Sequence, residues 1–111
     1  MTISLSVLAG PQYIEQNISV LYTATNSRAI IDKFTVTNVY ASDLTFSVHI
    51  VPKGGEASAT NQIIKARGIA PSETYTCPEL TGHIVPDNGT IQAIASYASG
   101  LVVYSSGRVV S

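Results

Sequence analysis

The stretch "LTFSVHIVPKGGEASATN", residues 44–61, shows the pattern that decides the fold. Apolar side chains occupy every second position from Leu44 to Ile50, and His49 falls among the polar side chains between them. An alternation with a period of two predicts a β-strand with one apolar and one polar face. The Gly-Gly pair and the small polar residues that follow predict a hairpin loop. A phosphate-binding loop is not indicated, because the order G-x-x-x-x-G-K-[ST] is absent.

The same period of two recurs along nearly the whole chain. Further strands are predicted in the stretches 2–7, 18–25, 29–39, 62–70, 74–80, 90–98 and 101–110. Within 29–39, we expect Ile30, Phe34 and Val36 on one face, which Asp32 interrupts, so a bulge or a strand end is expected near Asp32. The first strand is expected to end at "AGP", and the last strand to break or bulge around Gly107.

Turn residues separate these stretches at spacings near ten residues, and "PDNG" at 86–89 is the clearest turn signal. No window shows three consecutive helical repeats of apolar residues. The two prolines of "CPELTGHIVP" keep any helical turn there short. Without a repeat or a linker, residues 1–111 are predicted to form a single domain. The pattern predicts an all-β fold, an antiparallel β-sandwich of about eight short strands that is Ig-like or jelly-roll-like.

The chain carries few charges. Charged residues make up 12% of the sequence, and seven acidic and six basic side chains give a formal net charge of −1. Without a basic stripe or a polybasic patch, we expect no binding to nucleic acid and none to an anionic membrane. Low net charge also favours association. Composition alone fits both a monomer covered by Ser and Thr and a subunit whose surface is buried in an assembly.

The compartment is indicated by what the sequence lacks. Cys77 is the single cysteine, so neither an intrachain disulfide nor a Cys-rich zinc site is expected. The stretch "MTISLSVLAGPQ" has neither the basic nor the long apolar region of a signal peptide. No apolar run approaches the roughly 18 residues of a membrane helix. We therefore expect the protein to be made and folded in a cytoplasm.

Residue types that perform catalysis or bind metals are sparse. His49 and His83 form no H-x-x-x-H pair and lie outside metal-ligand spacing of Cys77, and no serine stands in a G-x-S-x-G motif. Both are expected to be structural histidines. Cys77 alternates with Tyr75, which predicts a small buried side chain, and its acidic neighbours offer no cation to activate a thiolate. We expect no catalytic, cofactor-binding or metal-binding residue.

The aromatic residues offer one candidate ligand site. The chain has six tyrosines and no tryptophan, and Tyr40 and Tyr97 fall near predicted strand ends. Together with Asn61, they are the candidate contacts to a ligand or a partner, because an exposed ring offers an apolar face and an amide offers hydrogen bonds. The alternative is that the tyrosines pack sideways on the sheets with their hydroxyl groups in water.

Four stretches carry a resemblance to a known family: "LYTATNSRAIIDKFTVTN", "TFSVHIVPKGG", "IAPSETYTCPELTGHIV" and "TIQAIASYASGLVVYSSGRVV". In this order, they resemble the small β-sandwich virion proteins encoded among the structural genes of tailed bacteriophages and prophages. The resemblance covers roughly residues 18–110 and consists of strand and turn patterns. The chain departs from it at "TATNSR", where the family turn more often contains Pro and Gly, and this changes the shape of that loop.

The resemblance implies a non-enzymatic structural protein that decorates or stabilises the capsid, or is fitted at the neck or tail. It would be located in the virion after synthesis in the host cytoplasm. The expected partners are other copies of the chain, with a trimer as the first expectation, and other phage capsid or tail proteins. Residues 1–10 are a candidate docking strand, because "TISLSVL" is an apolar alternation. The alternative is a carbohydrate- or receptor-binding module of a tail fibre or spike, built on Tyr40, Asn61 and Tyr97. A small enzyme is a third class, which no residue-level signal supports.

Overall fold

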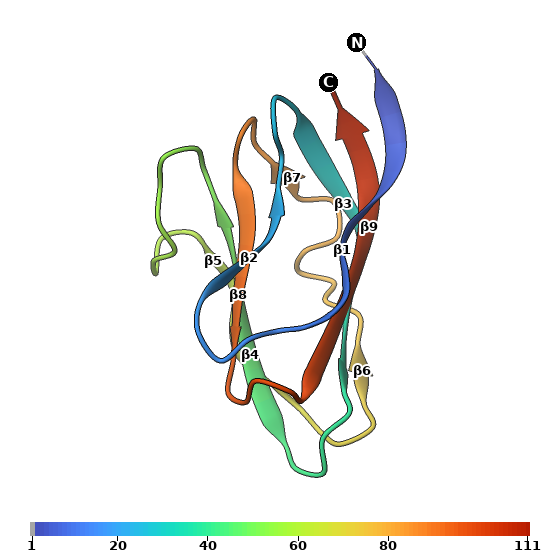
Figure 1. The fold of residues 1–111 in the computed structure, drawn as a ribbon, viewed down its shortest axis with the longest axis vertical. Coiled ribbons are helices and arrows are strands. Elements are labelled where there is room, and N and C mark those ends of the chain that lie inside the picture. Colours follow the sequence, from blue (N-terminus) through green and yellow to red (C-terminus); the bar gives the residue numbers. More distant parts are fainter. Residues whose placement is uncertain (1) are drawn as a thin grey trace.

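Two antiparallel sheets pack face to face in the computed structural model, which describes residues 2–111 (Figure 1). The strands are β1 (Ile3–Tyr13), β2 (Ser19–Thr23), β3 (Arg28–Asn38), β4 (Leu44–Val51), β5 (Gln62–Ile69), β6 (Thr74–Tyr75), β7 (Ile84–Val85), β8 (Thr90–Ala95) and β9 (Leu101–Val110). One sheet has the order β1-β9-β3-β6, with β7 also paired to β3, and the other has the order β2-β8-β4-β5. The predicted antiparallel β-sandwich is therefore confirmed, with nine strands in place of about eight.

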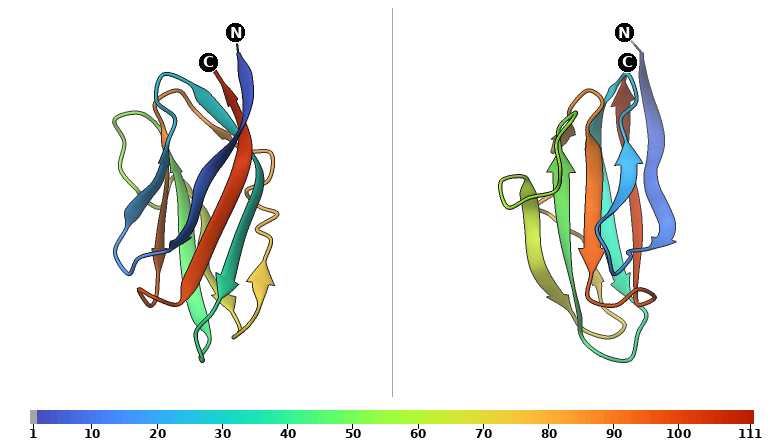
Figure 2. Two further views of the ribbon diagram at one scale, coloured as in Figure 1. Left: turned by 45° about the vertical axis from the view of Figure 1, so that its right-hand side comes forward. Right: turned by 60° about the vertical axis from the view of Figure 1, so that its left-hand side comes forward.

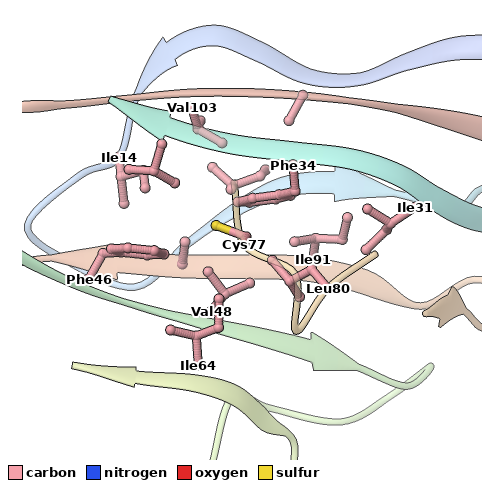
Figure 3. Close-up of a cluster of buried hydrophobic side chains, with 14 of the residues drawn as sticks. Ile14, Ile31, Phe34, Phe46, Val48, Ile64, Cys77, Leu80, Ile91 and Val103 are labelled. Carbon is pink, nitrogen blue, oxygen red and sulfur yellow. The ribbon is translucent and has the colours of Figure 1, made fainter. Parts of the chain in front are cut away.

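The core lies between the two sheets and follows from the period-two alternation (Figure 3). Phe34 of β3 and Phe46 of β4 are its largest fully buried side chains. Ile91 of β8 and Val103 of β9 are also fully buried, so the central strands of both sheets contribute to it. Burial of these apolar side chains is the main favourable contribution to folding. Cys77, from the segment between β6 and β7, is also fully buried, as the sequence predicted.

The face assignment in β3 was partly wrong. Phe34 and Val36 are buried as expected, but Ile31 is the buried isoleucine, and Ile30 is only partly buried. The pairing with β9 shifts between Ile31 and Lys33, so the bulge predicted at Asp32 is confirmed. A bulge inserts one residue and reverses the alternation on its two sides. The inward set before the bulge therefore contains Ile31 and excludes Ile30.

Strands β1 and β9 also differ from the predictions. β1 does not end at "AGP" but continues to Tyr13 through two register shifts. Gly10 permits this, because its φ is +76° and a Cβ there would run into the backbone of Val103. β9 is unbroken at Gly107, and the irregular positions lie in its partners β1 and β3. The backbone of Ile30 comes close to Gly107, which explains a glycine in a central strand.

The order of the strands places the end of the sequence in the middle of both sheets. β9 lies between β1 and β3, and β8 lies between β2 and β4. β1 and β5 lie on opposite sides of the sandwich, as the right view of Figure 2 shows. Thr2 and Ser111 lie together and exchange two backbone hydrogen bonds of 2.9 Å. In the part of the chain that the structure describes, no helix is long and apolar enough to cross a membrane.

Candidate functional site

Tyr40 and Tyr97 come together at one end of the sandwich. Tyr40 follows β3 and Tyr97 follows β8, and their ring centroids are 4.4 Å apart at an interplanar angle of 32°. Each side chain is about 40% exposed. Gly100 lies beneath the pair, because a Cβ there would contact the Cβ of Tyr40 at 3.2 Å and the ring of Tyr97 at 3.4 Å. The structure therefore joins two of the three predicted contact residues into one aromatic surface.

Asn38, the last residue of β3, holds the loop that presents Tyr40. Its side chain is fully buried, and its Oδ1 accepts a hydrogen bond of 2.8 Å from the backbone N–H of Tyr40. Its Nδ2 donates to the carbonyl groups of Ser42 and Ile69, both at 2.9 Å. One amide thus satisfies three backbone groups of two segments, and buried polar groups of this kind require such partners. Asn38 was not among the contact residues that the sequence predicted.

Asn61 does not join the two tyrosines. It lies in the loop between β4 and β5, where its backbone carbonyl accepts a hydrogen bond from Ile50, near the end of β4 remote from Tyr40. Its Nδ2 donates to the carbonyl of Glu56, and its Oδ1 accepts from the backbone N–H of Ser58. The Asn61 amide therefore stabilises its own loop. The expected grouping of this residue with Tyr40 and Tyr97 on adjacent loops is wrong, because the length of β4 separates them.

The same loop covers His49. The alternation correctly placed His49 on the face of β4 that points away from the core, where it pairs across the ladder with Gln92 of β8. The loop leaves the side chain only 7% exposed, and its Nδ1 lies 2.9 Å from Oδ1 of Asn61. Both observations describe a structural histidine. His83 is exposed, in the turn before β7. Within residues 2–111, no three His, Cys, Asp or Glu side chains gather closely enough to hold a metal ion.

Cys77 is held as a thiol by its surroundings. Its side chain is fully buried, and this burial, with a smaller effect of the nearby Glu79 carboxylate, raises the pKa of the thiol to about 12. A thiolate is the nucleophilic form of cysteine, so the group is unreactive near neutral pH.

A cluster of Arg67, Tyr75 and Glu79, which the sequence did not reveal, lies on the surface beside Cys77. The hydroxyl group of Tyr75 donates to the Glu79 carboxylate at 2.7–2.8 Å, and the Arg67 guanidinium lies 4.1 Å from the centroid of the Tyr75 ring. The hydrogen bond from Tyr75 lowers the pKa of Glu79, and the same bond raises the pKa of Tyr75. These contacts join β5 to β6 and the segment after it. They leave the Glu79 carboxylate ionised near neutral pH.

The first part of β1, which forms an edge of its sheet, exposes three large apolar side chains. Leu5 is 85% exposed, Ile3 58% and Val7 54%. Their cross-strand partners in β9 are Arg108, Val110 and Ser106, so all three lie on the outer face of the sheet. The edge strand β5 of the other sheet is different: it exposes Lys65 and Arg67, and Ala66 between them has a positive φ. Charges and irregular backbone are the features by which natural edge strands avoid pairing with another chain. β5 has them, and the segment Ile3–Val7 lacks charge altogether.

Comparison with known proteins gives a limited result. No protein-family model matches the chain, and no curated protein matches it. Among solved structures, it is similar to a chain in the structure of infectious bursal disease virus strain Gx, with 13% identity and a TM-score of 0.49 over 97% of this chain and 31% of that chain. A chain of strain Gt gives 13% identity and a TM-score of 0.39 over 97% of this chain and 28% of that chain. The chain thus spans less than a third of the length of either match. Both matches come from a virus, and the tailed-phage resemblance stays a prediction.

Proposed function

We propose that this protein is a non-enzymatic structural subunit of a virion, of the kind carried by tailed bacteriophages, and that it acts by assembling with copies of itself. The observation that carries the proposal is the uncharged, apolar edge of β1, with Ile3, Leu5 and Val7 turned to solvent. An isolated sandwich that must stay monomeric protects its edges. The bacteriophage setting comes from the sequence resemblance, in which the chain decorates the capsid or sits at the neck or tail beside other virion proteins.

The low charge of the surface supports the same role. Six basic and seven acidic side chains on 111 residues give little electrostatic repulsion between copies. In a symmetric particle, many weak contacts of one kind act together, so each single contact needs to bury only a small surface area.

The test is the mass of the purified protein in solution, by light scattering and native mass spectrometry over a range of concentrations. The expected result is a discrete multiple of 11.7 kDa that grows in population with concentration. A monomer at every concentration would contradict the assembly proposal. Mass spectrometry of virions purified from the source organism tests the setting, and the chain is expected there in a stoichiometric amount.

The Tyr40–Tyr97 pair favours a second candidate, a carbohydrate- or receptor-binding module. The two rings, in tilted contact, are partly exposed at one end of the sandwich, where a sugar face is able to pack against the outward side of either ring. A glycan array tests it: binding is expected to be lost in Tyr97→Ala and kept in Tyr104→Ala. The control residue Tyr104 is equally exposed but lies on β9 and takes no part in the pair. An array without signal for the unchanged protein would remove this candidate.

A further inference from the structure

The inference starts from the backbone groups at the free edge of β1. Thr2 and Ser111 exchange two backbone hydrogen bonds, so they form a hydrogen-bonded pair of the β1–β9 ladder. Such pairs alternate with non-hydrogen-bonded pairs in antiparallel ladders, and the register is regular from Ile3 to Val7. The N–H and C=O groups of Ile3, Leu5 and Val7 therefore point away from β9. β1 is the outermost strand of its sheet, so among residues 2–111 no strand pairs with these groups.

The sequence of this edge is chemically symmetric about Leu5. The segment "ISLSV", residues 3–7, has a serine on each side of Leu5 and a β-branched aliphatic residue beyond each serine. In an antiparallel pairing with a second copy, centred on Leu5, Leu5 lies opposite Leu5 of the other copy, Ile3 lies opposite Val7, and Ser4 lies opposite Ser6. Each pair thus joins side chains of the same polarity, which is the favourable arrangement across strands.

Electrostatics also permits a second copy at this position. The paired segment has no charged residue, and the one charge on the outer face of the neighbouring strand β9 belongs to Arg108. On β3, one strand farther away, Asp32 lies beside Arg108, and Arg28 and Lys33 are exposed opposite Val110 and Ser106. Within one protomer, Nη2 of Arg108 lies 2.9 Å from Oδ1 of Asp32, and the Nε of Arg108 donates to the same carboxylate. An approaching copy therefore meets no charge on β1 itself, and the Arg108 charge on β9 is paired with Asp32. Pairing of β5 with β5 of a copy would instead bring Lys65 and Arg67, which lie on the edge strand itself, against the equivalent charges of the copy.

We propose that two copies of this chain pair β1 with β1 about a two-fold axis through Leu5, so that their five-stranded sheets form one continuous sheet. The inference rests on the proposed assembly role and identifies its contact. The outward groups of Ile3, Leu5 and Val7 supply about six backbone hydrogen bonds to this contact. The contact is isologous, so it closes a dimer without leaving either β1 edge free. This contact favours a dimer in place of the trimer expected from the sequence.

Charge substitutions test which edge is used. Leu5→Lys places two ammonium groups opposite one another across the axis, and we expect the protein to become monomeric at a concentration at which the unchanged protein is dimeric. Val20→Lys is the matched control, because Val20 is about half exposed on β2, the edge strand of the other sheet. This variant is expected to stay dimeric. Leu5 is exposed, so Leu5→Lys is expected to keep the unfolding midpoint of the isolated domain. Mixing Leu5→Lys with Leu5→Glu is expected to restore a dimer.

Single cysteines test the register. Cα atoms of a hydrogen-bonded antiparallel pair are about 5.5 Å apart, within the range that a disulfide spans. Leu5→Cys is expected to form a covalent dimer under mild oxidation, and the buried Cys77 is not expected to react. Ile3→Cys and Val7→Cys are expected to cross-link efficiently only when they are mixed. If the protein assembles but Leu5→Lys leaves it assembled and no cross-link forms, this inference is wrong and the proposed function stands. A monomeric unchanged protein would contradict both.

Discussion

Replacing Asn38 with alanine is expected to lower the free energy of unfolding by about 3 kcal/mol or more, because a buried polar group left without its partner costs about 1–3 kcal/mol. The substitution removes the partner of three backbone groups: the carbonyl of Ile69 in a buried hydrogen bond, and the carbonyl of Ser42 and the N–H of Tyr40 in part-buried ones. Urea denaturation at a fixed protein concentration measures the effect. The Tyr40–Tyr97 pair is expected to loosen as well, which near-ultraviolet circular dichroism detects.

The control for this prediction is Asn17→Ala. Asn17 is exposed in the bend before β2, so the change is expected to stay within about 0.5 kcal/mol of the unchanged protein. A loss of less than about 1 kcal/mol in Asn38→Ala would mean that water replaces the amide, and the role assigned to Asn38 would be wrong.

Adding a single methyl group at Gly107 is the second large effect. The Cβ of Gly107→Ala would collide with the carbonyl of Ile30 and would lie 3.1 Å from a side-chain carbon of Leu8. Overpacking of this kind typically costs about 1–3 kcal/mol. We expect a value at or above the upper end of that range, because the obstacle is the backbone of a paired strand, which has no alternative rotamer.

Gly68→Ala is the matched control for Gly107→Ala. Gly68 also lies within a strand, but a Cβ there would meet no atom within 4 Å. Alanine at Gly68 is therefore expected to leave stability unchanged or slightly raised, since it restricts the unfolded chain. Thermal unfolding of both variants makes the comparison. Equal midpoints would show that the close approach of β3 and β9 relaxes without cost.

The alternation of side chains predicted most of the fold, because burial in a sandwich depends on the period of two alone. It placed Phe46 and Val48 in the core and His49 on the opposite face. It misassigned Ile30, because the position of a bulge fixes the phase of a strand, and a bulge at Asp32 shifts that phase by one residue. It ended β1 too early for a similar reason: Gly10 and Pro11 are frequent in turns, and only the neighbouring strand β9 shows that the chain continues there.

The candidate site was predicted in part, because contacts between loops depend on where each strand ends. Tyr40 and Tyr97 follow strands that end on the same side of the molecule, so proximity to strand ends was an informative signal. Asn61 also lies next to a strand, but at the opposite end of β4. The number of residues between Tyr40 and Asn61 does not show at which end of the sandwich each of them lies. The Arg67, Tyr75 and Glu79 cluster joins β5 with the region around β6, which the sequence does not reveal as neighbours.

The central positions of β8 and β9 have a consequence for the order in which the protein folds. On a ribosome, β1, β2, β3 and β4 emerge before the two strands that join them, since β9 separates β1 from β3 and β8 separates β2 from β4. The sheet that contains β2 is complete only when β8 has emerged, and the sheet that contains β1 only when β9 has emerged. Long-range pairing of this kind makes folding slow, because distant segments must meet before any of their contacts form. Until β9 emerges, β1 has no partner strand on either side, and its apolar side chains stay exposed. Nascent chains are therefore expected to depend on chaperones up to that point.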